Sequence, residues 1–283
     1  MTAIQALFLR GVKLLRSLPE TDPALEARLL LFKAAGLAER EFVTHPESLV
    51  SARVERRFLK LVDSRRARIP LAYLLGEKEF RSLPFLVPPG VFIPRPETEI
   101  LIERAISLAP KRGGIIVDIG TGSGNIAVSL AKSLPLAEIV AVDISSRALR
   151  AARANAGRQS VTNVIFVRGD LFAGLQRLGL QSGVDLVVSN TPYVAEGEWR
   201  KLEPEIREFE PKRALVPGPT GLEFIRRLVK GAPAFLKKGG WLAFEIGYDQ
   251  SERIPALLGS GWTDISIFPD LSGIPRIVAA RRD

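Results

Sequence analysis

The sequence predicts an α/β fold with a mostly parallel sheet, preceded by a small helical domain. From about Pro96 onward, short apolar runs rich in β-branched residues alternate with stretches of helical periodicity. That alternation is typical of a parallel sheet covered by helices on both faces. Before it, the first 70 or so residues show helical periodicity alone. The last two apolar runs have no helix between them, and we expect them to close the sheet as antiparallel strands.

The composition excludes several classes of protein. The chain has 283 residues, of which 46% are hydrophobic and 25% are charged, so it is neither disordered nor collagen-like. It contains no cysteine, which excludes disulfides, thiolate nucleophiles and sulfur-ligated zinc. His45 is the single histidine, so we predict no metal site, and a Ser-His-Asp triad only if His45 serves in it.

Charge and hydropathy indicate the kind of partner and the cellular compartment to expect for this chain. Its net charge of +9 favours acidic partners. No segment reads as a membrane span, since the nearest candidate, residues 113–131, is rich in Gly, Ser and Thr. Residues 1–15 lack the basic start and the cleavage site of a signal peptide. We therefore expect a cytoplasmic protein without membrane contact.

Residues 1–74 are predicted to form the helical domain. Leucines recur at helical spacing on each side of a break at Leu18–Pro23. Thr44 is expected to cap the start of a further helix, with Glu47 three residues on. These 74 residues carry 13 Lys and Arg against 8 Asp and Glu. The most basic stretch, Arg53–Arg68, is either a solvated helix face or a surface for an acidic partner.

A Pro-rich linker is expected at residues 75–94, and the α/β domain at residues 95–283. Short β-like runs at 79–81 and 85–87 predict a hairpin in the linker. In the α/β domain we expect strands at 115–119, 138–142, 164–167, 184–189, 241–246, 263–268 and 276–280, and helices at 126–134, 147–156 and 222–229.

A glycine-rich turn follows the first of these strands. Three glycines, Gly120, Gly122 and Gly124, separate the strand from the next helix. Glycines let the backbone turn sharply and let a ligand approach where a Cβ would clash. Ligands of open parallel sheets bind at the carboxyl ends of the strands. We therefore interpret Gly120–Gly124 as a cofactor loop.

The identity of the cofactor needs residues beyond this loop. Gly122 to Ala127 also satisfies the loose dinucleotide pattern G-x-G-x-x-A, so NAD stays open. Asp143 ends the next strand, where a carboxylate accepts hydrogen bonds from ribose hydroxyls of NAD or S-adenosylmethionine alike. Asp118, just before the first glycine, favours S-adenosylmethionine, because it would repel a pyrophosphate but suits the amino group of a methionine moiety, directly or through the loop that it braces. Leu171 and Phe172 follow the third strand, where they either sandwich an adenine or belong to the core.

The segment Asn190-Thr191-Pro192-Tyr193 ends the fourth strand and indicates the reaction class. The Asn190 side-chain oxygen can accept one N–H of a planar amide or amine, while a backbone carbonyl accepts the other. Pro192 stiffens the loop, and Tyr193 offers an aromatic face. Two acceptors on a nitrogen stabilise positive charge as it grows there during methyl transfer, and that reaction needs no metal.

Several stretches of the chain resemble the release-factor glutamine methyltransferases (the PrmC/HemK family), and the resemblance covers essentially the whole length. The combination of Ile93–Glu99 with Asn-x-Pro-Tyr is highly specific, whereas the glycine loop is generic to methyltransferases. The matching stretches are Leu71–Phe80, Ile93–Glu99, Asp118–Gly124, Asp143, Asn190–Tyr193, Glu210–Pro211, Phe244–Gly247 and Asp270–Gly273.

The resemblance implies a class I, Rossmann-like methyltransferase domain that uses S-adenosylmethionine. It implies N5-methylation of the glutamine in the Gly-Gly-Gln motif of class-1 peptide release factors, which would be the partners. By position, the methionine part of the cofactor would be held by Gly120, Thr121, Gly122, Ser123 and Gly124, with Asn190 beside it. Asp143 would hold the ribose and Leu171 would contact the adenine. Asn190, Thr191, Pro192 and Tyr193 would clamp the substrate amide, with Asn190, Pro192 and Tyr193 as the catalytic set.

Two positions depart from the family pattern. The family has Asn-Pro-Pro-Tyr, whereas this chain has Thr191 at the second position. Because that residue contributes its backbone carbonyl, and because Pro192 already favours an extended conformation before it, we expect the clamp to survive. Leu171 stands where relatives often carry an aromatic residue, so we expect weaker stacking on the adenine.

Two other functions remain open on the sequence. An adenine-N6 methyltransferase of DNA or RNA uses a similar clamp, because an exocyclic amine presents the same two N–H groups. Against it, residues 196–210 carry six Glu and three Lys or Arg, which suits a phosphate backbone poorly, so no stable nucleic-acid complex is expected. The other reading is a non-catalytic protein that binds S-adenosylmethionine and docks on the translation machinery, but such a protein needs no clamp.

Overall fold

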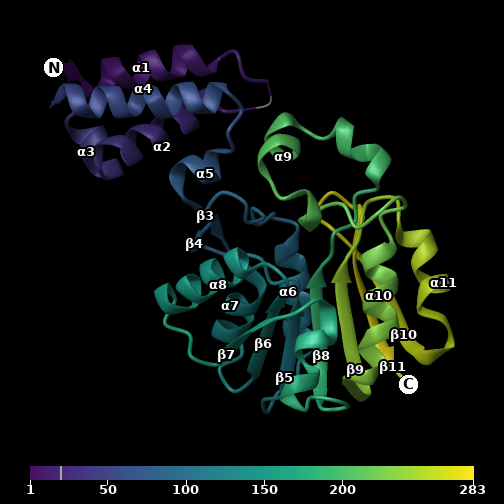
Figure 1. Cartoon of the computed structure of the whole chain (residues 1–283). Coiled ribbons are helices and arrows are strands. Elements are labelled where there is room, and N and C mark those ends of the chain that lie inside the picture. The colour runs from purple at the N-terminus through teal and green to yellow at the C-terminus, as the bar shows by residue number, and fades with distance from the viewer. Residues whose placement is uncertain (20) are drawn as a thin grey trace. The chain divides into compact units, whose positions relative to one another are not determined.

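The computed structural model describes residues 1–19 and 21–283, and the chain divides into two compact units (Figure 1). The first unit comprises Met1–Glu77 together with Glu203–Phe209, a short segment far along the chain. The second comprises Lys78–Leu202 and Glu210–Asp283. In the described residues no helix is long and apolar enough to cross a membrane.

The first unit is helical, as the sequence predicts. Its elements are β1 (Thr2–Ala3), α1 (Ile4–Leu15), α2 (Pro23–Ala35), α3 (Glu39–Thr44), β2 (Leu49–Val50), α4 (Ala52–Arg66), α5 (Leu71–Leu75) and α9 (Pro204–Phe209). Asp22 caps α2 by accepting from the backbone N–H groups of Ala24 and Leu25, and Gly36 ends it in the left-handed conformation. Leu7, Leu30 and Phe58 are fully buried between α1, α2 and α4 and centre the core.

The helix expected to start at Thr44 does not exist. Thr44 is instead the last residue of α3, and its hydroxyl donates to the Arg40 carbonyl within that helix. The chain then turns through Pro46 into β2, which pairs antiparallel with β1. The next helix, α4, starts after Ser51, whose side chain accepts from the Val54 N–H. The Thr-x-x-Glu pattern was therefore a helix end followed by a turn.

The second unit contains a seven-stranded sheet in the order β10-β11-β9-β8-β5-β6-β7. The strands are β5 (Ile115–Ile119), β6 (Glu138–Asp143), β7 (Val164–Arg168), β8 (Val184–Asn190), β9 (Leu236–Glu245), β10 (Trp262–Pro269) and β11 (Pro275–Arg282). Strands β5 to β9 pair in parallel, and β11 pairs antiparallel with β9 and β10. The expected closing strands are thus present. A two-stranded sheet of β3 (Glu77–Phe80) and β4 (Leu83–Leu86) precedes them.

Helices cover both faces of this sheet (Figure 1). One face packs on α6 (Thr98–Leu108), α7 (Asn125–Ser133) and α8 (Ser146–Arg158), and the other on α10 (Glu223–Gly231) and α11 (Ile254–Leu258). Ile116 and Val117 are neighbours in β5 but belong to different core clusters, because side chains of a strand alternate between its faces. Short 3₁₀ turns complete the unit at Leu171–Gly174, Gln176–Leu178, Glu196–Lys201, Lys212–Ala214, Ala232–Ala234, Ser251–Arg253 and Gly259–Gly261.

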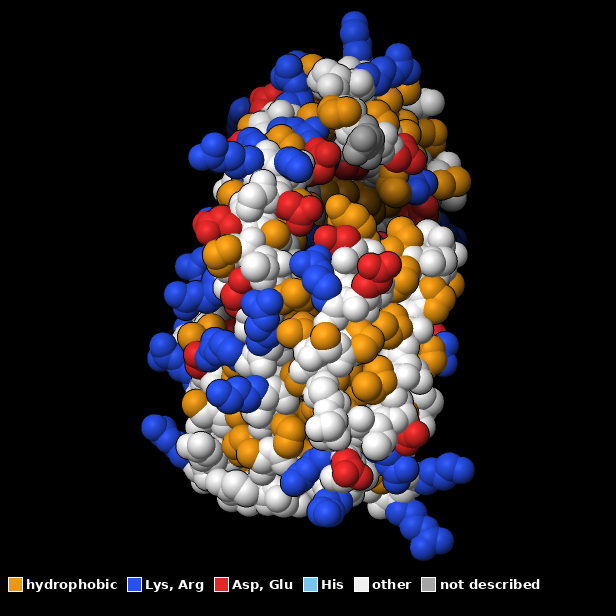
Figure 2. All heavy atoms as spheres, turned by 90° about the vertical axis from the view of Figure 1, so that its right-hand side faces the viewer, with side chains coloured by type: hydrophobic (Ala, Val, Ile, Leu, Met, Phe, Trp, Pro, Cys, Tyr) orange, Lys and Arg blue, Asp and Glu red, His pale blue; other side chains and the backbone are white. Residues whose placement is uncertain are grey.

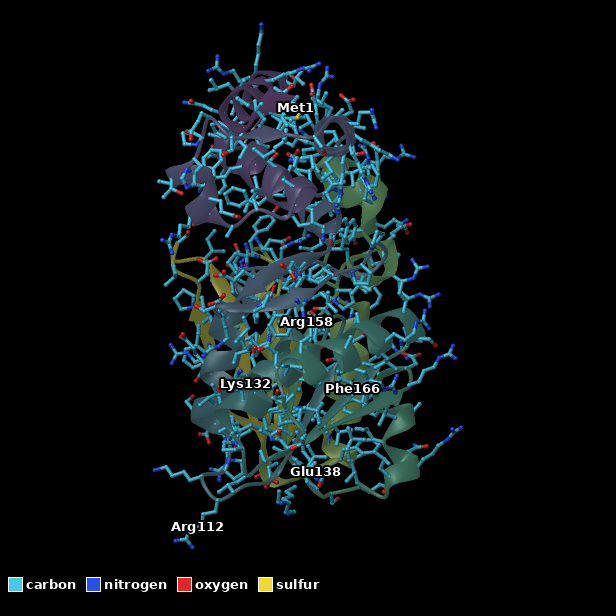
Figure 3. All side chains as sticks on the ribbon, turned by 90° about the vertical axis from the view of Figure 1, so that its left-hand side faces the viewer. Met1, Arg112, Lys132, Glu138, Arg158 and Phe166 are labelled. Atoms are coloured by element: carbon cyan, nitrogen blue, oxygen red, sulfur yellow. The ribbon has the colours of Figure 1, made fainter. Side chains whose placement is uncertain are left out.

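The parallel strands all end on one side of the sheet. Glu138 marks the beginning of β6, and Arg112 lies in the loop before β5 and points away from the ribbon (Figure 3). The loops that carry the predicted site follow the opposite, carboxyl ends of the strands.

Candidate active site

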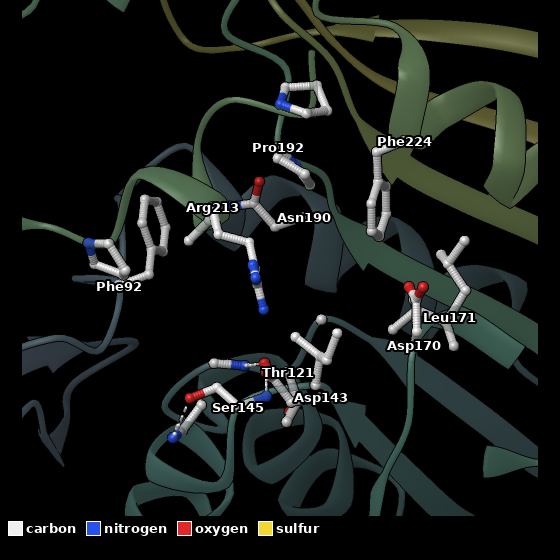
Figure 4. Close-up of a pocket in the computed structure, with 18 of the residues that line it drawn as sticks. Phe92, Thr121, Asp143, Ser145, Asp170, Leu171, Asn190, Pro192, Arg213 and Phe224 are labelled. Carbon is white, nitrogen blue, oxygen red and sulfur yellow. Dashed lines mark hydrogen bonds between the residues drawn. The ribbon is translucent and has the colours of Figure 1, made fainter. Parts of the chain in front are cut away.

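A pocket of about 850 Å³ opens at the carboxyl ends of the parallel strands, within the second unit. Its walls come from the loops after β5, β6, β7 and β8, together with residues 90–92 and 211–218 and the start of α10. Figure 4 shows Thr121 and Asp143 on one side of this space, Asp170 and Leu171 on a second, and Asn190 and Pro192 facing them. The predicted cofactor loop and amide clamp therefore meet in one cavity.

The glycine turn after β5 forms the floor of the pocket. Gly120 and Gly122 adopt positive φ angles of 78° and 57°, and a Cβ on either would meet no atom closer than 3.9 Å. The backbone is therefore open to a ligand on this side. Gly120, Thr121 and Gly122 line the pocket, whereas Ser123 is buried beside it. At Gly124 a Cβ would lie 2.9 Å from the Ala152 Cβ, so this glycine lets α7 approach α8.

Asp143, the last residue of β6, lines the pocket beside this turn. Its Oδ2 accepts from the Gly122 N–H at 2.9 Å, and its Oδ1 accepts from the Ser145 N–H at 2.7 Å. Burial raises the pKa of its carboxyl group, and these N–H donors oppose that shift. Each carboxylate oxygen can accept a second hydrogen bond, so Asp143 retains acceptors for two hydroxyl groups.

Asp118 lies behind the pocket and not in its lining. It is fully buried, and burial raises the pKa of its carboxyl group to about 7, although Thr121 and the Ala127 N–H lower it. This placement argues against direct contact between Asp118 and a ligand in the pocket. On the adjacent wall, Leu171 lines the pocket, while Phe172 stacks on Phe235 in the core, with the ring centroids 5.1 Å apart.

The four residues Asn190–Tyr193, of which the first ends β8, divide between the pocket and the structure beneath it. Asn190 and Pro192 line the pocket. Thr191 is buried and its hydroxyl donates to the Glu245 carbonyl at 2.7 Å. The Tyr193 hydroxyl donates to Glu245 Oε1 at 3.3 Å, and burial together with the charge of Glu245 raises the pKa of the phenol. The Gln250 side chain donates to the Tyr193 carbonyl at 3.0 Å, so the loop is held on several sides.

Several residues that line this pocket or lie directly behind it were not predicted from the sequence. Phe92, Arg213 and Phe224 line it, and Figure 4 shows the Arg213 side chain extending into the cavity. Beside the pocket, Arg95 pairs with the buried Glu210. Thr98 and Glu245 lie behind Asn190, and both belong to motifs that the sequence had already singled out.

Comparisons with known proteins agree with this geometry. A model of a methyltransferase domain matches residues 110–244, and a model of the PrmC N-terminal domain matches residues 6–76. A release factor glutamine methyltransferase of Koribacter versatilis is 39% identical over 283 residues, which covers 100% of this chain and 99% of the relative. The chain belongs to the release factor glutamine methyltransferase family.

Other members of this family are similarly related. The family member of Geobacter sulfurreducens is 40% identical over 263 residues, covering 93% of this chain and 88% of its own. The family member of Vibrio cholerae is 37% identical over 275 residues, which covers 97% of this chain and 95% of that relative. The chain thus matches these relatives through the helical unit as well as the sheet.

Solved structures share the fold. A methyltransferase from Pyrococcus furiosus superposes with a TM-score of 0.52 at 18% identity, covering 77% of this chain and 98% of that one. A ribosomal protein L11 methylase from Lactobacillus delbrueckii subsp. bulgaricus superposes with a TM-score of 0.51 at 21% identity. The match covers 70% of this chain and 84% of that one. At these identities the likeness establishes a class I methyltransferase fold.

The pocket of this release factor glutamine methyltransferase family member fits S-adenosylmethionine, the cofactor of the family. The open backbone at Gly120 and Gly122 leaves room for the methionine part. The free acceptor capacity of Asp143 suits the two ribose hydroxyls, and the apolar Leu171 suits an adenine face.

Proposed function

We propose that this protein methylates the N5 atom of the glutamine side chain in the Gly-Gly-Gln motif of class-1 peptide release factors, with S-adenosylmethionine as methyl donor. The observation that carries the proposal is that Asn190 and Pro192 line the same pocket as the glycine turn and Asp143. Family membership supports the same reaction, because relatives such as that of Koribacter versatilis carry this activity in their name.

Residues of the second unit would hold the cofactor. We assign the methionine part to Gly120, Thr121, Gly122, Ser123, Gly124 and Asn190, the ribose to Asp143 and the adenine to Leu171. S-Adenosylmethionine supplies a methyl group on a sulfonium sulfur, and the S–CH₃ bond breaks as the N–CH₃ bond forms, after which the nitrogen releases one proton to solvent.

The clamp would position the substrate amide and stabilise its nitrogen. The Asn190 side-chain oxygen would accept one N–H of the glutamine amide, and the Thr191 carbonyl the other. Both acceptors carry partial negative charge, so they favour the positive charge that develops on the nitrogen. Pro192 and Tyr193 would shape the slot that holds the amide plane.

The helical unit would supply recognition far from the reacting glutamine. Arg53, Arg56 and Arg57 are exposed on α4, and binding of an acidic surface of the release factor there would turn a generic amide into a specific substrate. The boundaries 1–74, 75–94 and 95–283 stay a prediction from the sequence, and in the structure the helical unit also takes in Glu203–Phe209. We expect a cytoplasmic enzyme that forms no stable complex with nucleic acid.

Mass spectrometry tests the proposal directly. The purified protein is incubated with S-adenosylmethionine in two parallel reactions. One contains a class-1 release factor and the other contains unmethylated DNA. One added methyl group on the Gly-Gly-Gln glutamine is the expected result. Methylated adenine in place of methylated glutamine would replace the proposal with the nucleic-acid reading. Transfer to neither, with cofactor binding measured separately, would favour a non-catalytic role.

A further inference from the structure

A chain of buried hydrogen bonds lies directly behind the Asn190 side chain. The Asn190 amide nitrogen donates to the Thr98 hydroxyl oxygen at 2.8 Å, and that hydroxyl donates to Glu245 Oε2 at 2.8 Å. Thr98 is 0% exposed and Glu245 is 1% exposed. Three elements contribute, because Asn190 ends β8, Glu245 ends β9 and Thr98 begins α6. Since Asn190 and Glu245 are also paired in register, the chain joins neighbouring strand ends.

The chemistry of this chain fixes which end of the Asn190 amide faces the pocket. An ionised carboxylate can only accept hydrogen bonds, so the single O–H of Thr98 is committed to Glu245 whenever Glu245 is ionised. Burial raises the pKa of Glu245 to about 7, so the ionised form predominates above that pH. The Thr98 oxygen is then left as an acceptor, and of the two ends of the Asn190 amide only the NH₂ group can donate to it. The Asn190 oxygen must therefore point the other way, toward the pocket that Asn190 lines.

The opposite orientation would defeat the clamp. An Asn190 turned by 180° about its last side-chain bond would present N–H groups to the N–H groups of a substrate amide, donor against donor. Such a rotation is easy for an unrestrained amide, because this terminal torsion is broad and roughly two-fold. A buried acceptor behind the amide therefore has a specific task that packing alone does not perform.

We propose that Thr98 and Glu245 are positioning residues, which hold the Asn190 amide with its oxygen toward the substrate nitrogen. This inference rests on the proposed function, since it assigns the clamp its acceptor. It also explains why the Ile93–Glu99 and Phe244–Gly247 stretches matter to an active site whose pocket does not include Thr98 or Glu245.

Substitution of Thr98 tests the proposal. Thr98→Val keeps the shape of the side chain but removes the hydroxyl, and we expect kcat for release-factor methylation to fall ~10–100-fold with little change in KM, since remote contacts are untouched. Thr98→Ser keeps the hydroxyl and is expected to stay within ~3-fold of the wild type. Ser129→Ala removes another buried hydroxyl, in α7, and serves as the control that leaves kcat unchanged. Thr98→Ala replaces Thr98→Val if the valine variant does not fold.

A double-mutant cycle separates positioning from a structural role. If Thr98 acts through Asn190, adding Thr98→Val to Asn190→Ala changes kcat by less than ~2-fold, because the amide to be oriented is already gone. An equal loss in both backgrounds would overturn the proposal, as would a Thr98→Val enzyme with wild-type kcat or a Thr98→Ser enzyme as slow as Thr98→Val.

A spectroscopic readout keeps this test independent of the reaction. The side-chain N–H signals of Asn190, identified by their absence in Asn190→Ala, are expected to exchange with D₂O at least ~10-fold faster in Thr98→Val than in the wild type, because their acceptor is lost. Equal exchange rates would contradict the hydrogen bond itself. Wild-type protein that fails to methylate glutamine would overturn the proposed function and leave this readout intact.

Discussion

Several polar side chains at the pocket and directly beneath it hydrogen-bond to backbone groups. Asp143 holds two N–H groups of adjacent loops, Thr191 holds the carbonyl of Glu245, and Gln250 holds that of Tyr193. A buried polar group is costly unless it is hydrogen-bonded, so such side chains define one arrangement of the loops. A geometry held in this way before substrate arrives is what charge stabilisation at a reacting nitrogen requires.

Loss of the clamp acceptor is expected to reduce turnover strongly. Asn190→Ala removes one of two groups that stabilise positive charge on the nitrogen, so kcat should fall ~10²-fold or more. Steady-state methylation of a release factor measures this, and binding of S-adenosylhomocysteine checks that the pocket persists. Turnover near the wild-type value would remove the clamp assignment.

The departure from the family at Thr191 is expected to be tolerated. Thr191→Pro removes the hydrogen bond to the Glu245 carbonyl but keeps the Thr191 position's own carbonyl and its extended conformation. We expect kcat within a few-fold of the wild type in the same assay. A large gain or a large loss would show that this loop is tuned to threonine.

The buried Asp118 predicts a pH dependence of stability. Because its pKa is raised from 3.8 to about 7 in the folded protein, the native state binds a proton more tightly than the unfolded state does. The free energy of unfolding therefore decreases as pH rises from about 4 to about 7. Asp118→Asn should lose this part of the decrease, as urea unfolding at several pH values would measure. Asp264→Asn, at an exposed carboxyl on β10, is the control. If the free energy of unfolding changes with pH in the same way in the wild type and in both variants, the assignment to Asp118 is refuted.

Among single residues, the sequence predicts the site residues at strand ends but not the buried residues that hydrogen-bond to them. Asn190 and Asp143 were found because each ends an apolar run, and parallel strands bring such ends together. Thr98 and Glu245 escaped because their hydrogen bonds join positions 92 and 147 residues apart. No local pattern reports a bond of that kind.

Among the elements, strands were easier to predict than helix ends. The apolar run 115–119 coincides with β5, but β9 begins at Leu236, five residues before the predicted start. Its first half includes Lys237, Lys238 and two glycines, which break the apolar pattern, and the register with β8 shifts between Leu236 and Trp241. The helix start predicted at Thr44 was wrong for another local reason. The residue types that cap the start of a helix also occur at helix ends and in turns.

The helical unit depends on a buried ion cluster that joins three helices. Arg65 of α4 donates to both carboxylate oxygens of Glu26 in α2, at 2.8 and 3.2 Å, and to Glu205 of α9 at 2.9 Å. Its side chain is only 6% exposed, and the two carboxylates raise the pKa of its guanidinium group against the effect of burial. A cluster of this kind is strongly destabilising to break, since the remaining charges stay buried.

Removal of Arg65 is therefore expected to unfold the helical unit selectively. Arg65→Met should destabilise it by ~3–5 kcal/mol, because Glu26 loses its counter-charge and Glu205 keeps only Arg68 of its two. The neighbouring Arg66 is 48% exposed and, among the described residues, pairs with Asp63, so Arg66→Met should cost ~0–1 kcal/mol. Hydrogen exchange of α4 peptides measures both. Equal protection in the two variants would contradict a structural role for the cluster.

At the scale of the molecule, the net charge of +9 is spread widely. Figure 2 shows Lys and Arg side chains at many points of one face, interspersed with Asp and Glu. Within the helical unit the basic residues gather on α4, where Arg53, Arg56 and Arg57 are exposed within one turn and a half of helix. This stretch is the one that we assign to the release factor.

Charge reversal on α4 tests this assignment. Changing Arg53, Arg56 and Arg57 to Glu should raise KM for intact release factor by ~10-fold or more while kcat stays close to the wild-type value, because rim charges act mainly on association. Reversal of Lys111, Arg112 and Arg177, exposed in the second unit, changes the net charge equally and is the matched control. The same KM in both triple variants would exclude a docking role for α4.

The helical unit is not contiguous in sequence, and this limits how the protein can be divided. Residues 203–209 fold with Met1–Glu77, although the chain on either side of them belongs to the second unit. A fragment ending at Glu77 would lack Glu205, the partner of both Arg65 and Arg68. An exchange of recognition domains between relatives, in the laboratory or during evolution, therefore has to transfer two segments together. A graft made at a single junction would leave the new domain without its last helix.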